Sequence, residues 1–161
     1  MIPTLETERT ILRPLRLEDH QDIFSYAKNS NLAKYTLWET HKTPEDSCNF
    51  IKDYALSNYE KNIPEPFGIE LKESHKIIGT VGCFWVCEKN QTMELAYALS
   101  EDYWRKGITT ETSRVVLKYC FENYQVERIQ CRCKSQNIGS YRVMEKLGMK
   151  YEGELRKAIF D

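Results

Sequence analysis

The chain has no excess of basic charge. Its 161 residues carry a formal net charge of -1 at pH 7, with a pI of about 6.3. Domains that bind nucleic acids ordinarily present a broad basic surface to the phosphates. The charge balance therefore argues against nucleic acid as a partner, and any anion site must be local.

Long apolar runs are also missing. The first 20 residues mix charged and apolar side chains, whereas a secretory signal needs a continuous apolar stretch. The longest mostly apolar run, Ile77 to Cys87, has 11 residues, which is too short for a helix that crosses a bilayer. The sequence predicts a cytoplasmic protein without a membrane span.

Cysteine pairs of the CxxC type are absent, although the chain has six cysteines. No histidine accompanies them, so we predict no metal site. Cys131 and Cys133 lie two positions apart in a strand-like run, as small buried hydrophobic residues do, and we expect reduced thiols. The Gly-x4-Gly-Lys-Ser/Thr phosphate loop is also absent, which argues against nucleoside triphosphate binding.

The apolar residues that are present suffice for one globular domain. The chain is 41% hydrophobic and 29% charged, and no repeat, low-complexity tract or linker divides residues 1–161. Hydrophobic periodicity and capping residues predict an alternating order of strands and helices. Strands are expected at 10–15, 67–71, 76–86, 92–99, 126–134 and 151–160, and helices at 18–28, 43–60, 109–124 and 138–147. This order indicates an α/β chain with a mixed sheet and helices on both faces.

Two finer expectations concern packing. The second helix should turn Phe50, Ile51 and Tyr54 toward the core, and the third helix should bury Val116, Leu117, Cys120 and Phe121. Gly79 and Gly82 mark possible bulges in the strand that contains them.

A basic loop, Trp104-Arg105-Lys106-Gly107, joins the strand at 92–99 to the following helix. The first amides of a helix lack partners inside the helix and carry partial positive charge, so the N–H groups from Gly107 to Thr110 could hold a phosphate. Arg105 and Lys106 add positive charge beside them. The alternative for so short a motif is an ordinary solvated turn.

Three segments together resemble the GNAT superfamily of acetyl-CoA-dependent N-acetyltransferases, in particular the RimJ/RimL-type branch that acetylates N-termini of ribosomal proteins. They are LETERTILRPLRLED, MELAYALSEDYWRKGITTE and NIGSYRVMEKLGMKYEGELR, in the order and spacing of the family. The resemblance spans nearly the whole chain. It implies an α/β (α+β) fold whose central sheet is mixed, mostly antiparallel, flanked by helices on both faces and splayed at the fourth strand.

The resemblance also implies that acetyl-CoA is the co-substrate and that no metal is needed. The loop amides would hold the pyrophosphate, and the end of the preceding strand would pair with the pantetheine amide. Arg105 stands where the branch often has glycine, and Thr109 where Gly or Ala is usual. The implied coenzyme-binding residues are Tyr97, Ala98, Leu99, Trp104, Arg105, Lys106, Gly107, Ile108, Thr109, Thr110, Asn137 and Ser140.

Acetyl transfer to an amine requires a neutral nucleophile and a polarised thioester carbonyl. The resemblance implies that Glu94, at the start of the splayed strand, is the base. The alternative is a strand carboxylate paired with a neighbouring Arg or Lys. A backbone N–H near Ala98 or Leu99 would polarise the carbonyl.

The departing thiolate needs a proton or another stabilising group. Ser140 is the implied catalytic acid or thiolate stabiliser, with Tyr141 as a substitute. Asn137 and Ser140 are equally typical caps of a helix N-terminus, so both roles stay open.

The predicted function is transfer of an acetyl group to a primary amine, by direct attack in a ternary complex. The amine is either a protein N-terminal α-amine or a small molecule, and the rival is a catalytically silent acyl-CoA-binding sensor or interaction module. The side chains of Tyr35, Trp38, Phe84 and Trp85 either line the acceptor pocket or belong to the core. Family members usually continue into a closing strand, whereas this chain stops at Asp161, so we expect an uncovered sheet edge and either a homodimer or a shortened chain.

Overall fold

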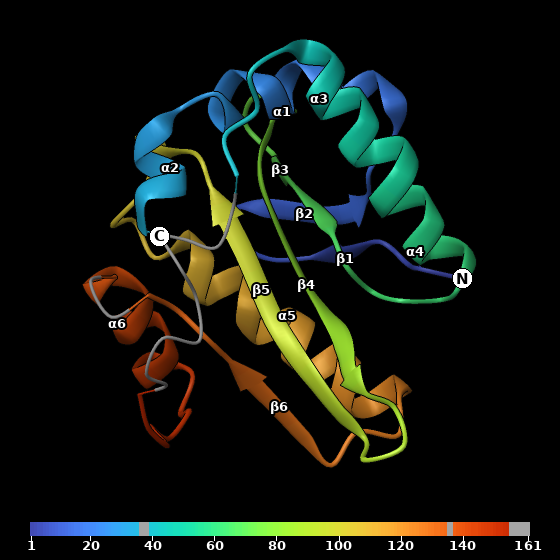
Figure 1. The fold of residues 1–161 in the computed structure, drawn as a ribbon, viewed down its shortest axis with the longest axis vertical. Helices are drawn as coiled ribbons and strands as arrows, with labels where there is room; N and C mark the ends of the chain where they lie inside the picture. Colours follow the sequence, from blue (N-terminus) through green and yellow to red (C-terminus); the bar gives the residue numbers. More distant parts are fainter. Residues whose placement is uncertain (36–38, 135–136, 155–161) are drawn as a thin grey trace.

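The computed structural model describes residues 1–35, 39–134 and 137–154, with residues 33–35 described by their backbone alone. Within these ranges the chain forms one six-stranded sheet with helices on both faces (Figure 1). The strands lie in the order β1-β2-β3-β4-β5-β6, and all neighbours are antiparallel except the parallel pair β5 and β6. The predicted fold class is confirmed.

The strands lie close to their predicted positions, apart from β1, which was not predicted, and the last ones. They are β1 (Leu5–Glu6), β2 (Thr10–Pro14), β3 (Phe67–Leu71), β4 (Ile77–Cys87), β5 (Thr92–Leu99) and β6 (Arg128–Cys131). β6 is shorter than the predicted 126–134. The strand predicted at 151–160 is wrong over Tyr151–Glu154, which lie in no strand, and its remainder falls outside the described residues.

The helices follow the predicted pattern apart from α2, which was not predicted. They are α1 (His20–Ala27), α2 (Ser30–Tyr35), α3 (Pro44–Asn49), α4 (Leu56–Glu60), α5 (Ile108–Asn123) and α6 (Ile138–Lys146), with 3-10 turns at Leu17–Asp19 and Glu101–Tyr103. α3 and α4 are joined by a π-helical segment, Phe50–Ala55, so the predicted second helix is continuous. The capping box before α3 is present, because the Thr43 side chain accepts a hydrogen bond from the Asp46 amide and Asp46 accepts one from Thr43.

The π-helical segment changes which side chains reach the core. The Leu56 amide bonds to the Ile51 carbonyl, five residues back, so this turn is wider than an α-helical turn. Ile51 and Ala55 are fully buried, while Tyr54 is 39% exposed, contrary to the prediction for Tyr54. The prediction for Phe121 is also wrong, since it is 50% exposed on the outer side of α5.

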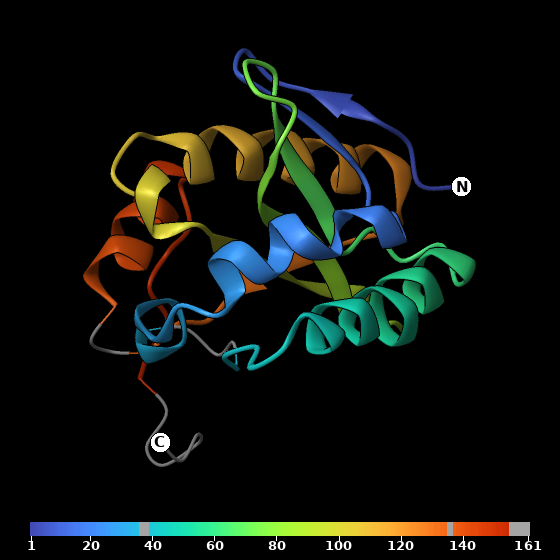
Figure 2. The same cartoon turned by 90° about the horizontal axis from the view of Figure 1, so that it is seen from above.

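The core has two parts, one on each face of the sheet. α5 covers one face, packing Val116 and Cys120 against strand residues such as Phe67 and Leu95. The helices α1, α3 and α4 lie on the other face (Figure 2), where Ile23 and Ile51 pack together. The sheet thus separates the two parts of the core, and a gap between two of its strands would connect its two faces. None of the described helices is long and apolar enough to cross a bilayer.

Two glycines of β4 have different roles. The register between β3 and β4 slips next to Gly79, as predicted. At Gly82 the β4–β5 register is regular, but an added Cβ would lie 2.5 Å from the Pro64 carbonyl oxygen and 2.6 Å from the Glu65 Cα. Gly82 therefore lets the segment around Glu65 lie directly against the sheet.

A buried ionic network ties β2 to the start of α1 and to β3. The Arg13 guanidinium lies 2.9 Å from the Asp19 carboxylate and 2.8 Å from that of Glu70, and all three side chains are at most 13% exposed. Burial by itself would raise the pKa of Asp19, but hydrogen bonds from Arg13 and the Arg16 amide bring it below the usual value.

Candidate active site

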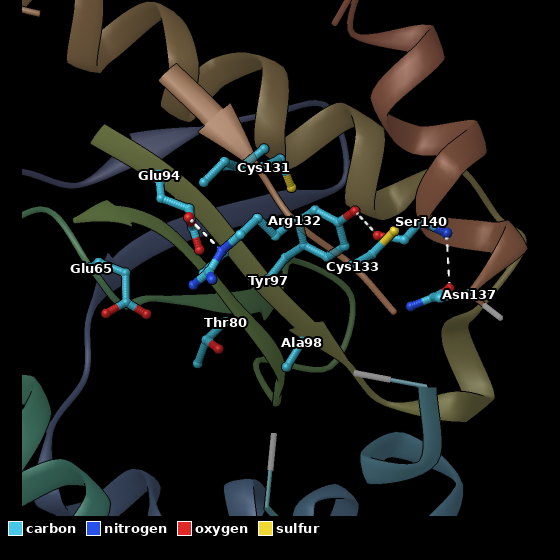
Figure 3. A pocket seen from close by; sticks show the side chains of 12 residues that line it. Glu65, Thr80, Glu94, Tyr97, Ala98, Cys131, Arg132, Cys133, Asn137 and Ser140 are labelled. Carbon is cyan, nitrogen blue, oxygen red and sulfur yellow. Dashed lines mark hydrogen bonds and ion pairs between the residues drawn. The ribbon is translucent and has the colours of Figure 1, made fainter. Parts of the chain in front are cut away.

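The sheet opens between β5 and β6. The two strands pair from Thr92 and Arg128 to Leu95 and Cys131, where β6 ends, while β5 continues to Leu99. A cavity of about 190 Å³ occupies the gap (Figure 3). The splay predicted for the strand at 92–99 is therefore present. The walls of this cavity include Glu65, Thr80, Glu94, Tyr97, Ala98, Arg132, Cys133, Asn137 and Ser140.

The end of β5 turns one backbone amide toward the gap. The Ser100 N–H donates to the Ile78 carbonyl of β4 at 2.7 Å. Bonded residues alternate in an antiparallel ladder, so Ala98 also faces β4, whereas Leu99 faces away from it. The Leu99 carbonyl is consistent with this orientation, because it accepts a hydrogen bond from the Trp104 indole N–H at 2.7 Å and not from β4. Of the two positions predicted to polarise a carbonyl, Leu99 directs its N–H into the gap.

The loop after β5 leads into α5 with the geometry of an anion cradle. Gly107, the N-cap, has a φ of 80°, and the Glu111 N–H is bonded to its carbonyl at 3.0 Å. The preceding helical N–H groups, from Ile108 to Thr110, have no acceptor within the helix. Three adjacent amides at the positive end of a helix fit a pyrophosphate.

Distant residues hold this loop in place. The Arg9 guanidinium donates to the Lys106 carbonyl at 2.9 Å and forms an ion pair with Glu111 at 2.9 Å. The Trp104 ring is partly buried and its N–H is bonded to Leu99, so it anchors the loop to the strand. Sequence inspection missed Arg9, since nothing local indicates a contact that spans 97 positions.

Two side chains of the loop face outward. Arg105 is exposed, and its φ of 65° lies in the left-handed region, which explains why glycine suits this position. The Lys106 ammonium lies 5.4 Å from the centre of the Tyr103 ring. Their contact with a bound phosphate stays a prediction.

Glu94 is buried in the gap and paired with a cation. Its Oε1 atom accepts hydrogen bonds from Gln130 Nε2 and Arg132 Nε, each at 2.9 Å, and its side chain is 6% exposed. This is the ion pair that the sequence left open as the alternative. Its role as the base stays a prediction.

Asn137 acts as the helix cap, whereas the Ser140 hydroxyl takes no part in capping. The Asn137 side chain accepts the Ser140 N–H at 3.0 Å and so caps α6. The Ser140 hydroxyl hydrogen-bonds instead with the Tyr97 hydroxyl, inside the cavity (Figure 3). Tyr141 packs its ring against Tyr151, with centroids 6.3 Å apart.

A second cavity lies beside α3, and neither Phe84 nor Trp85 lines it. Its volume is about 620 Å³, and the loop before α3 and the helical segment after it form its walls. Trp38 lies outside the described residues, as does the side chain of Tyr35. Of the two alternatives for Trp85, the structure shows the core, because its ring packs against Tyr124 beneath α5. The walls are Glu39, Thr40, His41, Lys42, Asp46, Phe50, Tyr54 and Glu65.

Glu65 is a wall of both cavities, and sequence inspection missed it. Its residue exposure is 7%, and its carboxyl accepts a hydrogen bond from the Tyr54 hydroxyl. Burial raises the pKa of Glu65 to about 7, although the bond from Tyr54 opposes this. A carboxyl between two prolines, in Ile63-Pro64-Glu65-Pro66, was the available signal.

The comparison with known proteins now decides the family. Residues 9–150 match the acetyltransferase (GNAT) domain. The chain belongs to the GNAT acetyltransferase family. The family resemblance drawn from the three sequence segments is confirmed, and so is the enzyme class, an acyl-CoA-dependent N-acetyltransferase. Among the described residues no group of three or more His, Cys, Asp or Glu side chains could hold a metal.

Individual relatives are similar over nearly their whole length. The uncharacterized N-acetyltransferase YnaD of Bacillus subtilis is 32% identical over 155 residues, which cover 96% of this chain and 87% of YnaD. The ribosomal-protein-S5-alanine acetyltransferase of Vibrio fischeri superposes with a TM-score of 0.84 at 26% identity, covering 98% of this chain and 88% of that one. Microcin C7 self-immunity acetyltransferase MccE, solved with acetyl-CoA and AMP, superposes with a TM-score of 0.84 at 22% identity. The match covers 95% of this chain and 85% of MccE and shows a shared fold.

Proposed function

We propose that this GNAT enzyme transfers the acetyl group of acetyl-CoA to a primary amine by direct attack, within a ternary complex. The acceptor is a protein N-terminal α-amine or a small amine. The observation that supports the proposal is that β5, the loop and the start of α5 follow one another directly, beside the point where β6 ends and the sheet opens. The MccE complex and the name of the Vibrio fischeri enzyme support the coenzyme and the α-amine, respectively.

The residues around the gap fit the coenzyme that the family implies. The amides of Ile108 to Thr110 would hold the pyrophosphate, with Arg105 and Lys106 beside them. Tyr97, Ala98 and Leu99 would flank the pantetheine arm on one side and Asn137 on the other. Tyr97, Ala98 and Asn137 line the cavity, and Leu99 is the last residue of β5. Bound acetyl-CoA supplies the activated acetyl group.

The chain supplies polarisation and a proton donor. The Leu99 N–H would bond to the thioester oxygen, where negative charge develops. Tyr97 and Ser140 would deliver a proton toward sulfur through their linked hydroxyls. Burial raises the pKa of Tyr97, so its hydroxyl keeps its proton at neutral pH. Two carboxyl groups that line the cavity are candidates for the base, the predicted Glu94 and Glu65.

An acceptor screen tests this function. Purified protein is incubated with acetyl-CoA and a panel containing peptides that begin with Ser, Ala or Thr and polyamines, and products are identified by mass spectrometry. Acetylated product is expected on the amine, and a variant with Tyr97→Phe and Ser140→Ala should form far less of it. If no acceptor is acetylated while acetyl-CoA binds, the silent-sensor alternative replaces the proposal.

Two further expectations stay predictions. The cytoplasmic location rests on the sequence. The homodimer would cover β6, an outermost strand of the described sheet, and light scattering that shows only monomer would contradict it.

A further inference from the structure

We propose that Glu65 accepts the proton of the incoming amine, and that the amine reaches it as an ammonium ion through the second cavity, between the loop at 39–42 and the Phe50–Ala55 segment. The inference rests on the proposed N-acetyltransferase function and deepens it by naming the base and the route of the acceptor.

The position of Glu65 is the first argument. A base must contact the amine at the point where the amine meets the thioester. Glu65 lines the cavity in the β5–β6 gap together with Thr80 and Ala98 (Figure 3), and it also lines the larger cavity on the helical face. A molecule that moves from the second cavity toward the gap therefore passes this carboxyl.

The second argument is the surroundings of the carboxyl. The donors to it are neutral, the Tyr54 hydroxyl and, at 3.5 Å, the Asn58 side-chain amide, and among the described residues no lysine or arginine forms an ion pair with Glu65. Glu94 differs, since its Oε1 atom already accepts two hydrogen bonds, one from the Arg132 guanidinium. Glu94 is thus paired with a cation, whereas both side-chain donors to Glu65 are neutral and reach its Oε2 atom, so the charge of the Glu65 carboxylate is available to an arriving cation.

Gly82 and the helical segment fix this carboxyl in place. The Cys83 N–H donates to the Pro64 carbonyl at 3.1 Å, and the Asn58 side-chain amide donates to the Glu65 carbonyl at 2.8 Å. These bonds hold the backbone of Glu65 between β4 and α4. A fixed base needs little rearrangement when the amine arrives.

The second cavity suits a cation. Its walls carry the carboxyl groups of Glu39, Asp46 and Glu65 against the ammonium of Lys42. The rings of Phe50 and Tyr54 stack with centroids 5.6 Å apart and form its aromatic side. Aromatic faces and carboxylates both favour an ammonium ion over an anion.

The proton transfers balance. The Glu65 carboxylate takes one proton from the ammonium, and the freed nitrogen lone pair forms the C–N bond as the C–S bond breaks with its electron pair on sulfur. The second amine proton is transferred to the thiolate sulfur by way of the linked hydroxyls of Tyr97 and Ser140 and neutralises its charge. Glu65 then releases its proton to solvent through the second cavity, and the products are the acetylated amine and free coenzyme A.

The ionisation of Glu65 is separable from that of its neighbours. Burial raises the pKa of Tyr54 and Tyr59, a hydrogen bond with Cys120 and burial raise that of Cys83, and burial lowers that of His41. These groups therefore stay uncharged near the pKa of Glu65, which is about 7. The titratable or charged groups that face Glu65 or share its cavities are Tyr54, Tyr59, Cys83, Glu94, Arg132, His41, Glu39, Lys42, Asp46, Tyr97, Cys131 and Cys133.

The kinetic test is the pH profile of kcat/KM for an acceptor found in the screen. The wild type should lose activity as pH falls through about 7, the pKa of Glu65. Glu65→Gln should lower kcat/KM by about 10²–10⁴-fold and abolish the acidic limb of the profile, which is the loss of activity at low pH. Glu65→Asp should restore part of the rate and part of the acidic limb. Tyr54→Phe should move the limb to higher pH, because the hydroxyl lowers the pKa of Glu65. Glu73→Gln, on the exposed turn between β3 and β4, is the matched control.

Two readouts do not depend on turnover. Carbon-13 NMR of the glutamate carboxyl groups should show one signal that titrates near pH 7 in the wild type and is absent from Glu65→Gln. Calorimetry should show unchanged acetyl-CoA affinity in that variant.

The outcomes separate the two proposals. Three results would overturn the Glu65 assignment only, provided that the wild type is active. They are a Glu65→Gln variant that keeps its rate and its loss of activity at low pH, a loss at low pH that only Glu94→Gln abolishes, and the absence of a carboxyl that titrates near neutrality. A wild type that neither binds acetyl-CoA nor acetylates any amine overturns both.

Discussion

The hydroxyl groups of Tyr97 and Ser140 hydrogen-bond to each other across the gap between β5 and α6. Tyr97 lies on the strand that pairs with β6 only as far as Leu95, and Ser140 lies in the first turn of α6, which Asn137 caps. The splay of the sheet and the cap of the helix thus bring together two hydroxyls that are 43 positions apart in the chain.

The hydroxyl pair should act as one unit in protonating the thiolate. Tyr97→Phe and Ser140→Ala should each lower kcat by about 10–100-fold, and the double variant should be little worse than the more damaging single variant. Tyr141→Phe should behave as wild type, since that ring packs on Tyr151. Steady-state kinetics with saturating acetyl-CoA measures this, and strictly multiplicative losses would contradict a shared role.

The left-handed conformation of Arg105 predicts a difference between two substitutions that remove the same charge. Arg105→Gly should be more stable than Arg105→Ala by about 1 kcal/mol, because alanine keeps the steric strain of a positive φ. Thermal unfolding compares the two variants. If the guanidinium also contacts the coenzyme, both should bind acetyl-CoA more weakly than wild type by a similar factor.

The buried pair of Arg13 and Asp19 predicts acid sensitivity. The folded-state pKa of Asp19 lies below its usual value of 3.8, so its stabilisation is present above that pH and is lost as the pH falls through the folded value. Asp19→Asn should cost about 3 kcal/mol at pH 7, since Arg13 loses a buried partner. Urea unfolding at several pH values measures both effects, and equal acid sensitivity in the variant would contradict them.

Glu65 predicts the opposite dependence on pH. Its pKa is about 7 in the folded protein against a usual value of 4.5, so the folded state binds more protons between these pH values and stability falls as the pH rises through that window. Glu65→Gln should remove this fall and be more stable than wild type above pH 7 by at most about 3 kcal/mol. The same difference in unfolding free energy between the two proteins at pH 4 and at pH 8 would contradict this prediction.

The sequence predicted the elements whose signals are local. Pro44 after Thr43 marked the start of α3, Gly107 marked the entry to α5, and Gly148 follows α6 with a φ of 81°. The family resemblance then predicted where the coenzyme binds. These features depend on a few adjacent residues, so one sequence suffices to find them.

Features that depend on tertiary packing were missed. No periodicity reveals the π-helical segment at Phe50–Ala55, which moved Tyr54 from the predicted core into the second cavity. Glu65 lies in a short Pro-flanked segment without strand or helix pattern, and its burial results from the close approach of Gly82. Glu94 matched the family pattern, but its partner Arg132 could be identified only once β6 was paired in register with β5.

Calorimetric titration with acetyl-CoA tests the central claim most directly, because coenzyme binding in the β5–β6 gap and at the start of α5 underlies every role proposed for the chain. The account predicts saturable binding of one acetyl-CoA per chain with a dissociation constant between about 1 μM and 1 mM, the usual range for enzyme substrates. Absence of binding heat at several temperatures, with about 1 mM acetyl-CoA present and no protection against thermal unfolding, would contradict it.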